Sequence, residues 1–117
     1  MSKFLKTIDT KNMKFYKVPK DIFSSSKYDN ISTEAKFLYT FLLDRMFLSE
    51  KNNWSDKNGE VYFYFTVEET MRLLKYGHGK VTRLFNELSQ ANLIYRKSCG
   101  PGKAKIIYMI KSSDLFN

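Results

Sequence analysis

Hydrophobic residues recur at helical spacing across residues 32–48, in the stretch STEAKFLYTFLLDRMFL. One apolar stripe consists of Ala35, Leu38, Tyr39, Leu42 and Met46, and this spacing predicts an amphipathic helix. Ser32 can cap its N-terminus, and Glu34 suits the positive end of the helix dipole. Because Phe37, Phe41 and Leu48 fall on roughly the opposite side, we expect this helix either at the centre of the domain or with one face against another subunit.

Two shorter helices are predicted between residues 66 and 92. The first begins with TVEE, in which Thr66 and Glu69 can satisfy each other's unpaired backbone N–H groups in a capping box. Its apolar positions are Val67, Met71 and Leu74, and a tight turn through Gly77 follows. The second helix begins at about Gly79, and its buried positions are expected at Val81, Leu84, Phe85 and Leu88. This arrangement indicates a helix-turn-helix.

The remaining regular elements are predicted to be strands. VYFYF (residues 61–65) has the aromatic and β-branched content of a short strand, and residues 14–20 suit a short strand or an extended arm ending at Pro19. LIYRKS (93–98) and KAKIIYMI (103–110) flank the turn Gly100-Pro101-Gly102 and predict a β-hairpin. The fold class is therefore α/β (α+β): a winged helix-turn-helix with a C-terminal β-hairpin wing.

The length of 117 residues fits one domain. We expect it to span residues 1–117, with an N-terminal arm at about 1–23, the helix-turn-helix at about 66–92 and the wing at about 93–110. No apolar run approaches the ~20 residues that cross a bilayer, and the opening sequence lacks the apolar core of a secretory signal, so we expect a cytoplasmic protein without a membrane partner. Cys99 and His78 are each the only residue of their kind, which provides neither a disulfide nor a zinc site.

Charge narrows the choice of partner. The net charge is +8, and residues 66–111 hold nine basic residues against three acidic ones. Such a balance favours a polyanion, either nucleic acid or an anionic membrane surface, although a basic surface kept for solubility would have the same composition. The predicted helix-turn-helix and wing favour double-stranded DNA.

The second short helix presents the candidate base-reading residues. Since its apolar positions define the inward side, Thr82, Arg83 and Asn86 are expected to face outward, and these residue types suit the base edges of a major groove. Gly79 would allow a phosphate to approach the helix N-terminus, where His78 and Lys80 flank it. The alternative is that these are ordinary surface residues of a core helix.

The hairpin presents candidate phosphate contacts. Arg96 and Lys97 are expected on its first strand and Lys103 and Lys105 on its second, with no acidic residue from 93 to 113. Phosphate contacts supply affinity without reading sequence. The alternative is a solvent-exposed turn with solubilising flanks.

Catalysis has little support in the sequence. His78 has no nucleophile motif around it, and Gly100-Pro101-Gly102 lacks the following Lys-Ser/Thr of a phosphate-binding loop. We therefore expect no enzyme, no catalytic residue, no cofactor and no metal.

A further set of residues precedes and includes the start of the helix-turn-helix. It begins with FYKVPKDIF (15–23) and continues with Tyr28, Ile31-Ser32, Ala35-Lys36, Tyr39, Leu42-Leu43, Asp44-Arg45, Leu48-Ser49, Trp54, Asp56, Gly59, Tyr62 and Phe65-Thr66. In this succession the chain resembles the N-terminal domain of RepA-type replication initiator proteins of Gram-positive plasmids, over about residues 15–110. Gly77-His78-Gly79 departs from the family's pattern, in which a polar capping residue such as Ser is common.

The resemblance implies a bacterial protein that binds repeats at a plasmid replication origin as a dimer and initiates plasmid replication. It also implies host replication proteins as partners, through a C-terminal region absent from this chain. For the homodimer interface, the aromatic residues of the arm and long helix are candidates: Phe15, Tyr16, Phe37 and Phe41. Two other functions fit the same fold, a winged-helix transcriptional regulator and a winged helix used for protein–protein contacts.

Overall fold

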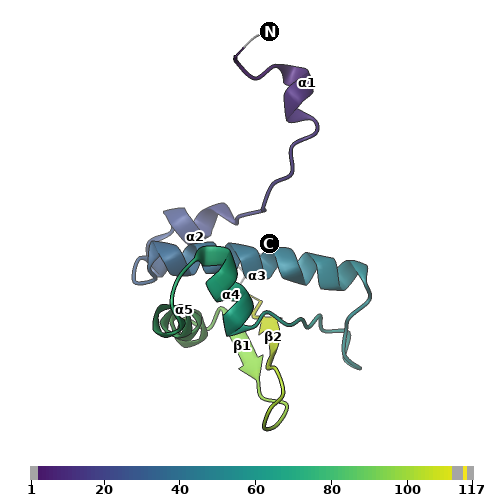
Figure 1. Ribbon diagram of the computed structural model, residues 1–117, viewed down its shortest axis with the longest axis vertical. Coiled ribbons are helices and arrows are strands. Elements are labelled where there is room, and N and C mark those ends of the chain that lie inside the picture. Colours follow the sequence, from purple (N-terminus) through teal and green to yellow (C-terminus); the bar gives the residue numbers. More distant parts are fainter. Residues whose placement is uncertain (1–2, 112–114, 116–117) are drawn as a thin grey trace.

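The computed structural model describes residues 3–111 and 115, and the other positions of the expected 1–117 domain lie outside the described residues. Along the chain, the elements are α1 (Thr7–Thr10), α2 (Lys20–Ser24), the 3-10 helix η1 (Ser26–Tyr28), α3 (Thr33–Lys51), α4 (Val67–Leu74), α5 (His78–Gln90), β1 (Ile94–Lys97) and β2 (Ile106–Met109). Figure 1 shows α3 crossing the body, the hairpin of β1 and β2 extending from one side, and the segment with α1 projecting from the other. The order α4, α5, hairpin is that of a winged helix.

Helix α3 forms the centre of the core, as its sequence predicts. The Ser32 hydroxyl caps it by accepting a hydrogen bond from the Ala35 N–H at 3.1 Å. Leu38 and Leu42 are fully buried on its inner side, which stabilises the fold by roughly 1.5–3 kcal/mol for each side chain. The outer side is different, because half of the Phe37 side chain remains exposed (50%).

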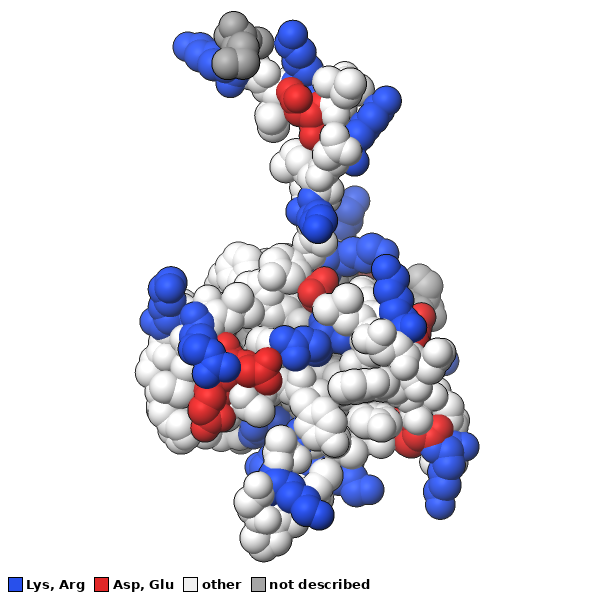
Figure 2. All heavy atoms as spheres, turned by 45° about the vertical axis from the view of Figure 1, so that its right-hand side comes forward, with Lys and Arg blue, Asp and Glu red and all other residues white. Residues whose placement is uncertain are grey.

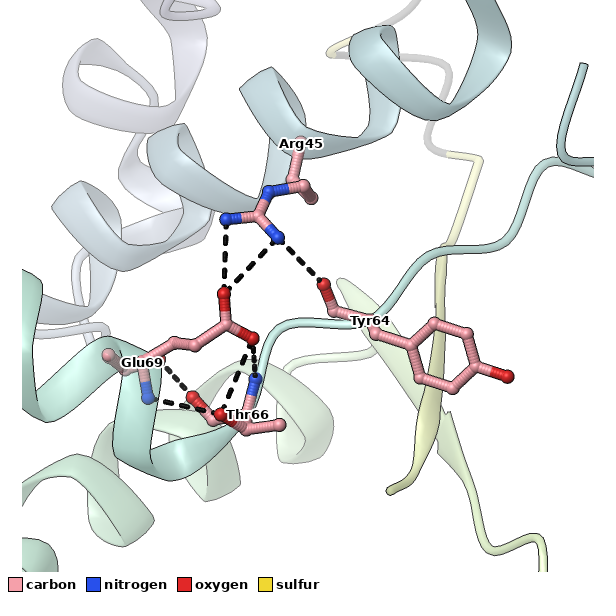
Figure 3. A network of polar contacts seen from close by, with 5 residues as sticks. Arg45, Tyr64, Thr66 and Glu69 are labelled. Carbon is pink, nitrogen blue, oxygen red and sulfur yellow. Dashed lines mark hydrogen bonds and ion pairs between the residues drawn. The ribbon is translucent and has the colours of Figure 1, made fainter. Parts of the chain in front are cut away.

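Helix α4 begins at the predicted capping box. The Thr66 hydroxyl accepts a hydrogen bond from the Glu69 N–H at 3.0 Å, and the Glu69 carboxylate accepts one from the Thr66 N–H at 3.2 Å. Arg45 reaches across from α3 and donates to the other Glu69 oxygen at 3.3 Å and to the Tyr64 carbonyl oxygen at 3.3 Å (Figure 3). Its guanidinium also lies over the Phe65 ring. This network fixes the start of α4 against α3.

Helix α5 packs on α3 through the predicted stripe, since Val81, Leu84, Phe85 and Leu88 are all fully buried. It begins at His78, one residue before the predicted start, and its N-cap is Gly77. Between α4 and α5, Lys75 adopts a left-handed conformation (φ 59°) that ends α4. The helix-turn-helix is therefore confirmed.

The sheet is smaller than the sequence predicts. Strands β1 and β2 are antiparallel, with Tyr95 opposite Tyr108 and Arg96 opposite Ile107. The predicted strand at residues 61–65 is wrong as a continuous strand: Val61 and Phe63 form single bridges, to Ser55 and Ile107. The reason is that the chain pairs with β2 only at Phe63 before it turns into the α4 cap at Thr66. The arm at residues 14–19 has no strand, and α2 begins directly after Pro19.

The hairpin also corrects the placement of two lysines. Strand β2 starts at Ile106, so Lys103 and Lys105 lie in the connecting loop and not on the second strand. Gly100 (φ 118°) and Gly102 (φ 74°) take left-handed backbone conformations there, which favour glycine. Both lysines are exposed in this loop.

Candidate nucleic-acid interface

The outer side of α5 presents the side chains expected to read bases. Arg83 and Asn86 are exposed and Thr82 is half-buried, as the helical spacing predicts. The buried residues Val81 and Phe85 define the inward side of α5, and the helical period places Thr82, Arg83 and Asn86 away from it, on a shared surface.

The N-terminus of α5 is open. Gly77 forms no side-chain cap, and a Cβ built at Gly77 or Gly79 would meet no atom within 4 Å. The N–H groups of the first helical turn have no partner within an α-helix, and together with the helix dipole they favour an anion. His78 is exposed and Lys80 half-buried at this end.

Lys80 is held in place by two neighbours. Its Nζ lies 3.9 Å from the centre of the Tyr76 ring and 3.5 Å from Glu34 Oε2 on α3. Sequence reasoning did not identify either contact. The first contact depends on the conformation of the turn before α5, in which Tyr76 lies, and the second depends on the packing of α3 against α5.

A cleft of about 300 Å³ separates α5 from the wing and the start of α4. Four of the predicted site residues line it together: His78, Thr82, Arg96 and Lys105. Glu68 also lines it and was not predicted as part of the site. The structure thus brings residues from α5 and the hairpin to one concave surface.

Arg96 connects the hairpin to α5. Its guanidinium lies 4.7 Å from the centre of the Phe85 ring, and Nη2 donates to Asn86 Oδ1 at 3.4 Å. Burial lowers the pKa of Arg96 from its ordinary value. The side chain therefore orients the wing relative to the helix, whereas Lys97, Lys103 and Lys105 are exposed. Figure 2 shows basic side chains on the hairpin, on the body and along the projecting arm.

The aromatic residues predicted for a dimer interface form two contacts on the outer side of α3. Tyr16 of the arm packs edge-on against Phe41 with ring centres 4.9 Å apart, and Phe37 contacts Phe23 at 6.0 Å. Phe15 is 69% exposed. The structure thus brings Tyr16 and Phe41 together, and leaves Phe15 in the solvent.

Among the described residues, no helix is both long and apolar enough to cross a membrane, and no three His, Cys, Asp or Glu side chains gather as metal ligands would.

Sequence comparison identifies the family. The family described as the N-terminus of replication initiator protein A (RepA) matches residues 14–114. This chain belongs to that family. A 41 kDa protein of Lactobacillus helveticus is 36% identical to the RepA N-terminal chain over 80 residues, which are 68% of this chain and 23% of that protein. The chain therefore spans less than a quarter of the length of this relative.

Three solved structures share the fold of the RepA N-terminal chain. The N-terminal domain of a DNA-binding protein is 32% identical, with a TM-score of 0.75 over 95% of this chain and 85% of that chain. A Rep–DNA complex is 32% identical, with a TM-score of 0.75 over 93% of this chain and 84% of that chain. The structure of an MDR initiator is 33% identical, with a TM-score of 0.72 over 93% of this chain and 86% of that chain. The winged-helix fold predicted for the chain is confirmed.

Proposed function

We propose that this RepA N-terminal chain binds double-stranded DNA sequence-specifically at a plasmid replication origin, as the DNA-recognition part of a replication initiator. The observation that carries the proposal is the cleft in which His78 and Thr82 of α5 face Arg96 and Lys105 of the hairpin. A winged helix binds DNA with its second helix in the major groove and its hairpin against the adjacent backbone. The similar structures, a Rep–DNA complex and a DNA-binding protein, support the same function.

In this proposal Thr82, Arg83 and Asn86 read bases. Arg83 can donate two hydrogen bonds to guanine, Asn86 can pair with adenine, and Thr82 offers a hydroxyl and a methyl group. The contact from Arg96 occupies one lone pair of Asn86 Oδ1, which leaves its other lone pair and its amide N–H groups for a base. Arg96 therefore supports base reading by orienting Asn86.

Phosphates are assigned to two regions. One phosphate lies at the open N-terminus of α5, near His78, Gly79 and Lys80, because a side-chain cap is absent there and a Cβ at Gly77 or Gly79 would meet no atom within 4 Å. The others lie along the wing, where Lys97, Lys103 and Lys105 are exposed, and where Arg96 is available at the edge of the cleft. These contacts supply affinity and its salt dependence.

The chain acts in this proposal as a homodimer in the bacterial cytoplasm, on repeated sites. The exposed aromatic surface of the arm and α3, with Phe15 and Phe37, supports a second copy as its partner. The 41 kDa relative is much longer than this chain, and we assign recruitment of host replication proteins to a further region of such a longer protein.

The test begins with selection of bound sequences from random duplexes, followed by titration of the selected and a scrambled duplex at two ionic strengths. We expect Arg83→Ala to lower affinity for the selected duplex by ~1–3 kcal/mol and to reduce discrimination. Lys97→Ala should weaken both duplexes alike and reduce the salt dependence.

Unchanged discrimination by Arg83→Ala would refute the placement of α5 in the groove. Absence of salt-sensitive binding by the unaltered protein would instead favour a winged helix used for protein contacts. Direct repeats among the selected sequences would favour an initiator over a transcriptional regulator.

A further inference from the structure

Glu34, which lies outside the helix-turn-helix, sits beside the basic residues of α5. Its Oε2 is 3.5 Å from Lys80 Nζ, and the charge of Arg83 also acts on it. Lys80, Arg83 and Glu87 occupy one stripe of α5, because they are spaced by three and four residues. The N-terminus of α3 therefore lies beside the stripe of Lys80, Arg83 and Glu87 on α5.

The position of Glu34 is fixed by its neighbours in the chain. The backbone N–H and the hydroxyl of Ser32 donate to the two carboxylate oxygens of Glu87, each at 2.9 Å. Because Ser32 is also the N-cap of α3, this pair of hydrogen bonds ties the start of α3 to the last turn of α5. Glu34, in the first turn of α3, is held opposite Lys80.

Glu34 carries a full negative charge at neutral pH. A hydrogen bond to its own backbone lowers the pKa of Glu34 from the ordinary value. Burial opposes this effect in part, and the contact with Lys80 and the charge of Arg83 lower the pKa further. Its side chain is 40% exposed and that of Lys80 is 36% exposed. A phosphate that approached Lys80 would thus meet an ionised carboxylate on one side and the Tyr76 ring on the other.

We propose that Glu34 is a specificity-determining residue of this interface, which weakens binding to non-target duplexes more than binding to the target. The inference rests on the proposed function. In a non-target complex, affinity comes from phosphate contacts, and the protein adopts the position in which its Lys and Arg side chains contact the most phosphates. Glu34 restrains Lys80 from making such a contact, because the ion pair holds Lys80 Nζ beside the first turn of α3.

In the target complex the same charge matters less. Base contacts by Arg83 and its neighbours fix the position of α5 in the groove, so Lys80 cannot move to improve a phosphate contact whether or not Glu34 is charged. An interaction that disfavours complexes with the wrong partner is a general way to gain specificity.

The experiment compares Glu34→Gln with the unaltered protein on the duplex selected by that protein and on a scrambled duplex, across a range of salt. One additional phosphate contact steepens the log–log salt slope by about 0.9, which corresponds to roughly eightfold tighter binding at 0.1 M salt. We expect that gain on the scrambled duplex and a change of less than about twofold on the selected one.

Two controls separate the contact from net charge. Glu50→Gln removes the same charge at the other end of α3, where Glu50 is exposed, and should leave the ratio of the two affinities unchanged. In the double variant Glu34→Gln with Lys80→Gln, the gain on the scrambled duplex should disappear, because Lys80 makes the additional contact. Thermal melts confirm that each variant folds.

An equal gain on both duplexes, or no gain on either, would overturn the proposal. A loss on the selected duplex without a gain on the scrambled one would do so as well, and would make Glu34 a base-contacting residue. Failure of the unaltered protein to prefer its selected duplex would instead contradict the proposed function, so the two failures are distinguishable.

Discussion

Glu69 connects the start of the helix-turn-helix to the central helix, and replacing it tests how that start is held. One oxygen of its carboxylate accepts the Thr66 N–H at 3.2 Å, and the other accepts two Arg45 N–H groups at 3.3 Å each. Figure 3 shows that the three side chains come from α3, from the N-cap and from the first turn of α4. Two substitutions at Glu69 separate these interactions.

The expected cost follows from the contacts that each substitution removes. Glu69→Ala loses its part of the capping box, about 1 kcal/mol, and a favourable charge at the helix N-terminus, about 0.3–1 kcal/mol. It also loses the ion pair with Arg45, which contributes at most about 0.5 kcal/mol because the side chains are 36% and 32% exposed. The sum is about 2 kcal/mol. Glu69→Gln keeps an oxygen for the Thr66 N–H and loses only the charge terms, about 1 kcal/mol.

Urea unfolding followed by circular dichroism measures both values, and thermal melts should show midpoints lower by about 8 °C and about 4 °C. Glu68→Gln is the matched control, because Glu68 is exposed in the same first turn and has the same relation to the helix dipole. If Glu69→Gln and Glu68→Gln lost the same free energy, the Arg45 contact would contribute nothing. A loss below about 0.5 kcal/mol for Glu69→Ala would refute the capping argument itself.

Three further predictions concern the core, the loop before α4 and the outer surface. The Tyr39 hydroxyl is buried without a hydrogen-bond partner among the described residues. Tyr39→Phe should therefore raise the free energy of unfolding by about 1 kcal/mol in urea unfolding. A decrease of that free energy by a similar amount would contradict this prediction. Hydrogen bonds from the Glu60 and Asn58 N–H groups and from the Tyr108 hydroxyl lower the pKa of Asp56. A lowered pKa in the folded state stabilises the protein above the unfolded-state value near 4, and this stability is lost as the pH falls through the folded-state pKa. The difference in melting temperature between the unaltered protein and Asp56→Asn should therefore be constant above about pH 5 and shrink below about pH 4; a difference that persisted at low pH would refute the assignment. Phe37→Asp should lower the free energy of unfolding by about 1 kcal/mol, because half of the side chain is exposed and the rest packs on Phe23. It should also shift sedimentation equilibrium from dimer to monomer; an unaltered protein that is monomeric throughout the concentration range would rule out the proposed dimer.

The sequence by itself determined α3, α4 and α5 and their boundaries to within a few residues, whereas it did not predict the short helices α1, α2 and η1. Helical spacing and local capping are properties of neighbouring residues, so Ser32 and the Thr66–Glu69 pair marked the starts of α3 and α4. The same spacing placed Arg83 and Asn86 on the exposed side of α5, because burial of Leu84 and Phe85 leaves no other orientation.

Only the tertiary structure decided what depends on distant parts of the chain. The aromatic run at 61–65 has the composition of a strand, but its pairing is limited by where β2 lies, and only Phe63 bridges to it. Arg96 was expected on the wing as a phosphate contact, and only the packing of the hairpin on α5 placed its guanidinium over Phe85 and in the lining of the cleft. Glu34 was identified only as a favourable helix-start residue, and the packing of α3 on α5 brought it to Lys80. Local periodicity thus specifies which side of a helix faces the solvent, whereas charge pairs between elements depend on packing that no local pattern contains.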